Sequence, residues 1–431
     1  MTEKKRFVGT IFLCEDRAVT SLTDNTVLLS DPVTLAVSIS DSGVDEIIVF
    51  DCSEKGNDIS HDKTIDEIRL ICKAVDVPVT GAFNIKRMED AKKLLYAGCK
   101  KVLIDFRKDG DTDVLKEISD KFGKEKVLIS YDNIEDLKKK ADAVKACSSE
   151  LVLFSDSLKL PEPAFNEPVL LFYYGSSSET TPDKLLIENS FLSGVAGQII
   201  SDSAGELDEY KKLLSDKGFN MSALESSFTW DDLKKNSDGM VPVIVQDYRT
   251  DQVLMLAYMN EEAYNTTLRT GKMTYFSRSR NELWIKGETS SHYQYVKSLT
   301  ADCDLDTILA RVRQIGAACH TGSYSCFFNE IAKKDFDEKN PQKVLDSVFE
   351  VIKDRKVNPR EGSYTNYLFD KGIDKILKKV GEEATEMVIA AKNPNGNEVV
   401  YEMSDFLYHM MVLMAEKGVS WEDITDELSR R

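Results

Sequence analysis

The first 218 residues alternate short apolar runs with amphipathic stretches of helical spacing. The helical stretches include residues 64–75, 87–98 and 112–123. Strands that alternate with helices are typical of a parallel sheet, and eight such strands predict a (β/α)8 barrel. The expected strands are 7–14, 45–51, 77–83, 100–106, 126–132, 150–155, 168–174 and 197–201. The connection at 156–168 has no helical pattern, so we expect a somewhat reduced barrel.

The pattern changes after residue 218, where residues 219–227 are expected to be a linker. Further on, apolar runs and turn signals predict a small α+β domain at 228–330. Its expected strands are 241–247, 252–259, 273–279 and 282–288, and its expected helix is DTILARVRQIG (306–316). A polar second boundary lies at 328–343. Helical spacing then predicts an all-α domain at 344–431, so the fold class is a multidomain chain with an N-terminal barrel.

Composition and charge narrow the functional class. The chain has 56 Lys and Arg against 74 Asp and Glu, which gives a net charge of −18. Such a chain repels nucleic acids and anionic membranes, so a phosphate ligand must meet local cations or a bound metal. There is no long apolar stretch and no signal peptide at the start, which predicts a cytoplasmic protein.

Three of the eight cysteines lie close together in DCDLDTILARVRQIGAACHTGSYSC (302–326). Cys303, Cys319 and Cys326 would suit a catalytic zinc site, which has three protein ligands and one open position. His320 would be the fourth ligand or the group that handles a proton. Buried structural cysteines are the alternative, and this interpretation is preferred for the five scattered cysteines.

Three aspartates alternate with other residues at the start of the same stretch. In an extended segment Asp302, Asp304 and Asp306 lie on one side and Cys303 on the other. Carboxylates favour Mg²⁺ and thiolates favour Zn²⁺, which predicts two adjacent metal sites. Helix N-capping is the alternative, and it explains one aspartate better than three.

Acidic residues also recur at helical spacing near the C-terminus. Glu382 and Glu386 share one helix face, and Glu402 and Asp405 lie on another helix, with His409 near the same face. Two acidic helices can hold Mg²⁺ between them, although a solvated acidic face is the alternative.

Residues 243–290, followed by DCDLD (302–306) and ACHTGSYSCF (318–327), resemble phosphoribosyl-AMP cyclohydrolase over roughly residues 228–328. The resemblance implies a homodimer in which Cys303 of one subunit joins Cys319 and Cys326 of the other around zinc. It also implies that Asp302, Asp304 and Asp306 hold Mg²⁺. Zinc lowers the pKa of bound water toward ~7, and the hydroxide would open the adenine ring at N1–C6.

The substrate-facing residues of this domain are candidates from side-chain chemistry. His320 would move the proton, Arg278, Arg280 and Lys286 would meet phosphates, and Trp284 would stack on the base. A solvated strand and core packing are the alternatives. The family has glycine where this chain has Ser291, so a turn with positive φ would be strained there.

EGSYTNYLF (361–369), DKILKKVGEEATEMVIAAK (374–392) and EMSDFLYHMMVLM (402–414) resemble phosphoribosyl-ATP pyrophosphohydrolase, an all-α family. The resemblance implies Mg²⁺ on the triphosphate, held by Glu382, Glu383, Glu386, Glu402 and Asp405. Glu382 and Glu383 would be catalytic, and Lys378 and Lys379 would bind phosphates. Because the product, phosphoribosyl-AMP, is the substrate of the middle domain, we expect a bifunctional hydrolase of histidine biosynthesis.

Residues 31–51 and 87–104 are similar to the histidine-pathway barrels, namely the cyclase subunit of imidazole glycerol phosphate synthase and its isomerase relative. Those barrels hold phosphates with glycine-rich loops, but here Phe83 follows Gly81 and Ala82 and would obstruct the loop. Asp132 is the candidate for one catalytic carboxylate, and Glu15 or Asp16 for the other. We expect a barrel without its original activity. A retained isomerase or cyclase activity, or a regulatory binding module, is the alternative.

Overall fold

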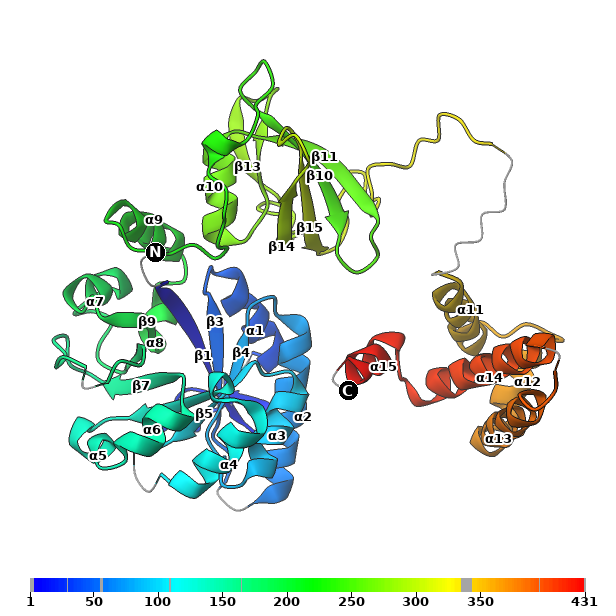
Figure 1. Ribbon diagram of the computed structural model, residues 1–431, viewed down its shortest axis with the longest axis horizontal. Coiled ribbons are helices and arrows are strands. Elements are labelled where there is room, and N and C mark those ends of the chain that lie inside the picture. The colour runs from blue at the N-terminus through cyan, green and yellow to red at the C-terminus, as the bar shows by residue number, and fades with distance from the viewer. Residues whose placement is uncertain are drawn as a thin grey trace. The chain divides into compact units, whose positions relative to one another are not determined.

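The computed structural model describes residues 4–28, 30–54, 57–107, 110–163, 165–334, 343–394 and 396–429 (Figure 1). The chain forms two compact units, residues 1–329 and 330–431. The first unit holds a barrel and a smaller α+β domain, and the second is helical. The NPQ boundary signal at Asn340–Gln342 lies outside the described residues.

The barrel predicted from the sequence is confirmed. Eight parallel strands form a closed sheet, because β1 also pairs with the last strand, with Phe7 opposite Val195. A short antiparallel strand, β2 (Arg17–Val19), extends β1. The parallel strands are β1 (Arg6–Cys14), β3 (Glu46–Asp51), β4 (Val79–Ala82), β5 (Lys101–Asp105), β6 (Val127–Tyr131), β7 (Glu150–Ser155), β8 (Val169–Tyr173) and β9 (Leu192–Ala196).

Helices surround this sheet, and four of those in its described part begin at a side-chain N-cap. The side chains of Asp31, Asn57, Asp111 and Asn133 accept hydrogen bonds from backbone N–H groups in the first turn that follows each of them. In the described part of the β7–β8 connection no helix forms, as expected for a reduced barrel. The helices are α1 (Pro32–Asp41), α2 (Asp58–Ala74), α3 (Met88–Ala97), α4 (Thr112–Phe122), α5 (Ile134–Lys138), α6 (Ala141–Cys147), α7 (Pro182–Glu188), α8 (Gln198–Asp202) and α9 (Leu207–Asp216), with a 3-10 turn η1 (Lys124–Lys126).

The predicted eighth strand, residues 197–201, is wrong. This segment starts α8, and the strand is LSGVA at 192–196, in which all five residues are buried. A Cβ on Gly194 would lie 2.4 Å from the carbonyl oxygen of Arg6, so only glycine permits this close strand pairing. Gly197, at φ +113°, then turns the chain into the helix.

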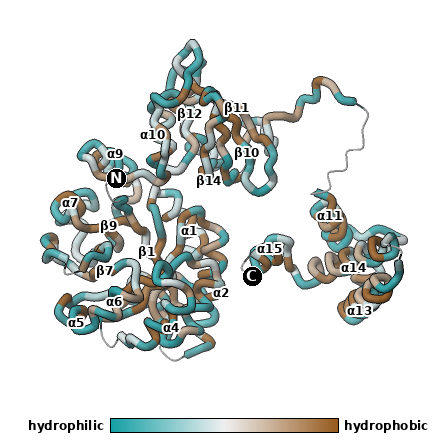
Figure 2. The backbone as a smooth tube through the Cα atoms, viewed as in Figure 1, coloured by the Kyte–Doolittle hydropathy of each residue, from teal (hydrophilic) through white to brown (hydrophobic). Residues whose placement is uncertain are grey.

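The interior of the barrel has an aromatic layer at the C-terminal ends of the strands and an ionic layer at their N-terminal ends. Phe154 stacks on Phe172 with ring centroids 4.3 Å apart, and both lie beside Phe50. At the other end Arg6 lies 3.2 Å from Glu46 and contacts Glu150. Figure 2 shows the hydrophobic residues concentrated along the strands, which are covered by amphipathic helices.

The α+β domain has a four-stranded sheet in the order β11-β10-β15-β14, one helix and a separate hairpin. The helix predicted at 306–316 is wrong, because residues 308–314 form a strand whose burial alternates strictly. Ile308, Ala310 and Val312 are buried, while Arg311 and Arg313 lie on the other side of the strand. The elements are η2 (Trp230–Asp232), β10 (Val241–Asp247), β11 (Val253–Met259), α10 (Glu261–Thr270), β12 (Thr274–Ser277), β13 (Glu282–Ile285), β14 (Gln294–Ala301) and β15 (Ile308–Gln314).

The second unit is helical, as predicted. Its core joins Phe349, Ile352, Leu368, Ile376 and Met411 from four helices. The helices are α11 (Val344–Val357), α12 (Tyr364–Lys371), α13 (Ile373–Ala390), α14 (Gly396–Lys417) and α15 (Trp421–Leu428). None of the helices in the described ranges has both the length and the apolar character that crossing a membrane requires.

Candidate active sites

Cys319 and Cys326 come together in the tight turn that follows β15. The Cys319 thiol is buried and accepts a hydrogen bond from the Thr321 hydroxyl at 3.2 Å, which lowers its pKa. The Cys326 N–H donates to the Leu254 carbonyl at 2.7 Å, which fixes the second thiol to strand β11. Partial burial and the neighbouring Cys319 raise the pKa of Cys326. The turn therefore presents two thiols as one pair.

Cys303 lies apart from this pair. It precedes β15, is exposed, and its sulfur lies 3.9 Å from an Asp304 carboxylate oxygen. Among the described residues, no group of three potential metal ligands within one chain includes a cysteine. One chain thus brings two of the three predicted thiolate ligands together.

The three aspartates of DCDLD do form a group. Ligand oxygens of Asp302, Asp304 and Asp306 lie within 4.8 Å of one another, and all three side chains are exposed. The Asp302 carboxylate accepts the N–H groups of Asp306 (3.0 Å) and Thr307 (3.1 Å) and so closes a turn before a strand. Helix capping is excluded as their explanation, because no helix follows.

Lys286 and His320 lie beside the thiol pair. The buried Lys286 ammonium donates to the Ala318 carbonyl at 2.7 Å, next to Cys319, and burial lowers its pKa. The exposed His320 ring has its Nδ1 4.0 Å from the Cys319 sulfur. Both are placed to act on a molecule at the thiols.

The other predicted substrate residues have partners within the domain. Arg278 stacks over Tyr258, 3.9 Å from its ring centroid, and Arg280 lies 3.2 Å from Glu282. Trp284 is half-buried and packs on Tyr275 at 5.5 Å, which agrees with the core-packing alternative.

Ser291 adopts φ +60°. Its N–H donates to the Gly287 carbonyl at 2.7 Å, which closes the turn between β13 and β14. The turn requires the left-handed conformation that glycine adopts freely, so the strain expected at this position is confirmed.

In the helical unit, α13 and α14 bring three carboxylates together. Ligand oxygens of Glu383, Glu402 and Asp405 lie within 4.8 Å of one another, and Glu383 is buried. Glu382 and Glu386 are exposed and lie outside this group. Local desolvation and the nearby Glu383 carboxylate raise the pKa of Glu386. The group therefore brings three of the five predicted ligands together, and a metal-binding role for Glu382 and Glu386 stays a prediction.

Lys379 and His409 flank the buried Glu383. The Lys379 ammonium lies 3.0 Å from Glu383 and 3.1 Å from Glu382, while Lys378 is exposed. The buried His409 donates from Nδ1 to the Asp405 carbonyl at 2.8 Å and lies 3.7 Å from Glu383. Its Nε2 is 3.1 Å from the Tyr364 hydroxyl. The spacing of residues in the sequence did not predict Tyr364 as part of this site.

The barrel mouth holds a cavity of about 770 Å³ at the ends of β3 to β6. Asp132 lines it, whereas Glu15 instead pairs with Lys63 at 3.1 Å. The Arg107 guanidinium lies 4.7 Å from the Phe83 ring and 4.2 Å from the Phe154 ring, and it is paired with Asp105. Phe83, Asp105 and Arg107 also line the cavity, and Phe154 is buried beside them.

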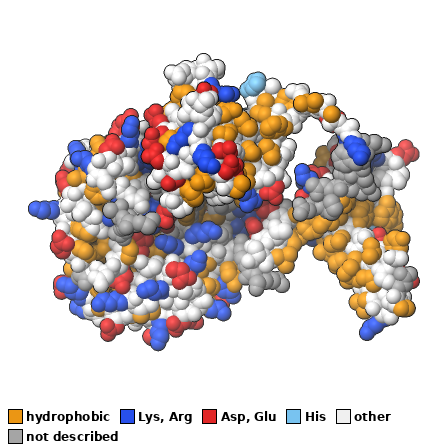
Figure 3. Space-filling model, turned by 45° about the horizontal axis from the view of Figure 1, so that its top comes forward, with side chains coloured by type: hydrophobic (Ala, Val, Ile, Leu, Met, Phe, Trp, Pro, Cys, Tyr) orange, Lys and Arg blue, Asp and Glu red, His pale blue; other side chains and the backbone are white. Residues whose placement is uncertain are grey.

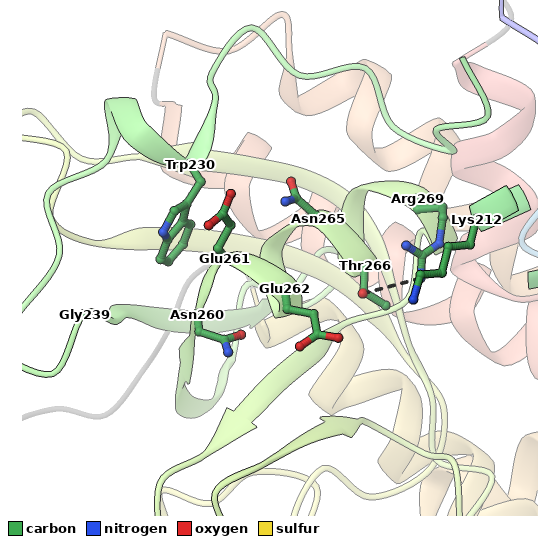
Figure 4. Close-up of a pocket in the computed structure, with 9 residues that line it drawn as sticks. All are labelled: Lys212, Trp230, Gly239, Asn260, Glu261, Glu262, Asn265, Thr266 and Arg269. Atoms are coloured by element: carbon green, nitrogen blue, oxygen red, sulfur yellow. Dashed lines mark hydrogen bonds between the residues drawn. The ribbon is translucent and has the colours of Figure 1, made fainter. Parts of the chain in front are cut away.

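A further cavity of about 570 Å³ lies between α9, the connecting segment and α10 (Figure 4). Lys212 and Arg269 line it together with Glu261 and Glu262, and none of its lining residues is a predicted site residue. The mixed charge gives it no preference for an anion or a cation. It marks the junction of the barrel with the α+β domain.

Three family models match the chain. Phosphoribosyl-AMP cyclohydrolase matches residues 255–328, and phosphoribosyl-ATP pyrophosphohydrolase matches residues 345–431. The model described as histidine biosynthesis protein matches residues 11–151, inside the barrel.

Curated relatives match the C-terminal part of the chain. A histidine biosynthesis bifunctional protein HisIE from Thermoanaerobacter pseudethanolicus is 54% identical over 209 residues, which is 46% of this chain and 97% of the relative. Proteins of the same name from Lactococcus lactis and Bacillus subtilis are 51% and 47% identical, over 44% and 47% of this chain and 88% and 95% of their own lengths.

Proposed function

The chain belongs to the family of the histidine biosynthesis bifunctional protein HisIE, and on this basis we propose which side chains carry out its two hydrolytic steps. The C-terminal domain converts phosphoribosyl-ATP to phosphoribosyl-AMP and pyrophosphate, and the central domain opens the adenine ring of that product. Both domain families use metal ions.

We assign the first step to Glu383, Glu402 and Asp405. Their convergence from two helices is the observation that carries the assignment, because three carboxylates at this spacing suit a hard cation such as Mg²⁺. A Mg²⁺ ion held there neutralises charge on the triphosphate. Glu382 and Glu386, at the exposed edge of the cluster, would complete the ligand set when substrate is present. Lys378 and Lys379 would face the phosphates.

For the second step we propose a zinc site at Cys319 and Cys326, completed by Cys303 of the partner subunit. The paired thiols are soft donors of the kind zinc prefers, and the exposed Cys303 is free to reach a second copy. A zinc ion held there would lower the pKa of a bound water and so provide the nucleophile at neutral pH. His320 would move the proton, and Asp302, Asp304 and Asp306 would hold Mg²⁺ against the substrate.

The homodimer has independent support in the helical unit. Large apolar side chains of α13 and α14 are exposed, among them Val388 (61%), Ile389 (59%), Val400 (61%) and Tyr401 (69%). Figure 3 shows hydrophobic side chains gathered over this unit. A patch of this kind is typical of a protein interface, and a second copy of the same helices would cover it.

We propose that the barrel is non-catalytic. Two features support this proposal: the Phe83 side chain lines the mouth where the related barrels have a glycine-rich phosphate loop, and the Arg107 cation beside it is paired with Asp105. A ligand bound in the outer cavity beside Asp132 is the alternative. Incubating the full chain with the isomerase and cyclase substrates of the pathway, and finding turnover, would favour the alternative.

Product analysis of the full chain tests the residue assignments. With phosphoribosyl-ATP as substrate, Glu383→Gln should leave the substrate unconsumed while added phosphoribosyl-AMP is still opened. Cys326→Ser should release pyrophosphate normally and accumulate phosphoribosyl-AMP. Each variant is the control for the other. Wild-type rates of both steps in both variants would refute the assignments.

A further inference from the structure

We propose that the barrel positions the cyclohydrolase site. Asp41 and Asp76 of the barrel are the positioning residues, because they hold strands β14 and β15 of the central domain against the barrel. The inference rests on the cyclohydrolase function of the central domain. The barrel thereby gains a role that needs no ligand in its mouth. The relative from T. pseudethanolicus is matched over 97% of its length by the C-terminal part of this chain, which leaves no room in it for a barrel.

Asp76 forms the first part of this junction. It follows α2, and its carboxylate lies 2.7 Å from the Lys297 ammonium on β14 and 3.6 Å from the Arg313 guanidinium on β15. The Arg313 group also donates to the carbonyl of Ala74, the last residue of α2, at 2.9 Å. The Asp76 side chain is only 12% exposed, so solvent screens these charges weakly.

Asp41 forms the second part. It is the last residue of α1, and its carboxylate accepts a hydrogen bond from the Tyr295 hydroxyl on β14. Its carbonyl accepts the Lys272 ammonium at 2.6 Å. The negative carbonyl ends of α1 and α2 thus both meet cations of the cyclohydrolase domain, which is the favourable orientation for a helix dipole.

The two strands held in this way lead directly into the candidate site. The chain continues beyond the end of β15 through Gly316 to Cys319, and the segment that begins at Lys286 leads into β14 and Tyr295. The Ile315 N–H donates to the Tyr293 carbonyl at 2.9 Å, which joins the two segments beyond the ends of the strands.

The contact between these segments is close. A Cβ on Gly316 would lie 2.6 Å from the His292 ring, so the backbone there is pressed against the segment that carries Lys286. Lys286 in turn donates to the Ala318 carbonyl, next to Cys319. A shift of β14 against β15 would therefore move Lys286 relative to the thiols.

Removing Asp76 would leave Lys297 and Arg313 facing each other without their shared carboxylate. We expect their repulsion to loosen the strand ends. A displacement of about 1 Å at a catalytic group costs up to ~100-fold in rate. We therefore expect Asp76→Asn to lower kcat of ring opening about tenfold with a smaller change in KM. Asp41→Asn should act in the same direction.

The test measures both activities in full-length variants. Asp76→Asn should lower ring opening of phosphoribosyl-AMP and leave pyrophosphate release from phosphoribosyl-ATP unchanged, so the helical domain is an internal control. Asp136→Asn removes an exposed barrel ion pair with Lys139 (2.6 Å) and should change neither rate. Hydrogen exchange of residues 286–293 should rise in Asp76→Asn and stay unchanged in Asp136→Asn.

Lys297→Met removes the same contact from the other side and should reproduce both effects, while Asp76→Glu should restore part of the rate. Unchanged ring opening and unchanged exchange in Asp76→Asn and Lys297→Met would overturn the positioning role. A wild-type chain that does not open phosphoribosyl-AMP would refute the reaction instead, and the exchange measurement would still decide whether the barrel holds the segment.

Discussion

Lys211 and Asp45 form a buried ion pair that joins the last barrel helix to the start of the second parallel strand. The ammonium and carboxylate lie 2.6 Å apart, and the two side chains are 2% and 4% exposed. Asp45 also accepts the Phe7 N–H at 2.8 Å, so the pair links β1, β3 and α9. The ion pair therefore joins the C-terminal helix of the barrel to its first two parallel strands.

Loss of one partner of this pair should be costly. Lys211→Met leaves the Asp45 carboxylate buried without its cation, and we expect the barrel to lose about 3–5 kcal/mol of unfolding free energy. Urea unfolding followed by circular dichroism measures the change. Lys139→Met, which breaks an exposed pair, should cost below ~1 kcal/mol. Equal costs in the two variants would contradict the prediction.

His61 should make barrel stability depend on pH. Its Nδ1 lies 2.5 Å from Asp51, and this hydrogen bond raises the pKa of His61 in the folded state. A raised pKa means that the stabilisation is fully present below the unfolded value of about 6.5 and is lost as the pH rises through the folded value. Unfolding curves at pH 5.5 to 8.5 should show this loss in the wild type. A parallel loss in His61→Gln would argue against it.

The two active sites should differ in the metal they require. After chelation, the full chain should lose both activities, because the proposed ligands are carboxylates at one site and thiolates at the other. Mg²⁺ alone should restore pyrophosphate release, and ring opening should need Zn²⁺ as well. Restoration of ring opening by Mg²⁺ alone, in protein shown by elemental analysis to lack zinc, would remove the thiols from the mechanism.

His409 should support the carboxylate cluster without binding the ion. It fixes the Asp405 backbone and lies 3.7 Å from Glu383, and groups in such a position typically change metal affinity 10–100-fold. We expect His409→Asn to raise the Kd for Mn²⁺, measured by electron paramagnetic resonance, about tenfold. Tyr408→Phe, which removes only the contact with Thr365 (2.7 Å), is the matched control. Equal affinities would show that His409 has no such role.

Ser291→Gly should stabilise the cyclohydrolase domain. A serine at φ +60° is strained by about 1–2 kcal/mol, and the greater freedom of glycine in the unfolded chain offsets part of the gain. We expect the unfolding free energy, measured by thermal unfolding, to increase by roughly 0.5 kcal/mol, and we expect ring opening to be retained. Ser290→Gly, at a position without positive φ, should destabilise. A gain from both variants would mean that the turn conformation is not the cause.

Most of the fold follows from the local pattern, and the failures have physical causes. The apolar runs predict seven barrel strands, but LSGVA contains a serine and a glycine. Gly194 is buried against β1, and the buried Ser193 hydroxyl donates to Glu150 on β7, which are tertiary contacts. Arg311 and Arg313 made β15 look like an amphipathic helix, although period-two burial shows that they mark one face of a strand. Only tertiary pairing with β10 distinguishes the two.

The candidate sites also combine contacts that local spacing predicts with contacts that only tertiary packing decides. Residues three or four apart on a helix must share a face, so Glu402 and Asp405 were predictable as neighbours. That Glu383, rather than Glu382, meets them depends on how α13 packs on α14. The Tyr364 contact with His409 likewise joins two helices far apart in the sequence, which no spacing rule can reveal.

The Arg107 guanidinium contacts the Phe83 and Phe154 rings and pairs with Asp105, so the core beneath the barrel mouth is densely packed. A packed core of this kind resists deformation, so the ends of α1 and α2 can keep a neighbouring domain in a constant position. In our proposal, the barrel is a rigid support for the ring-opening domain.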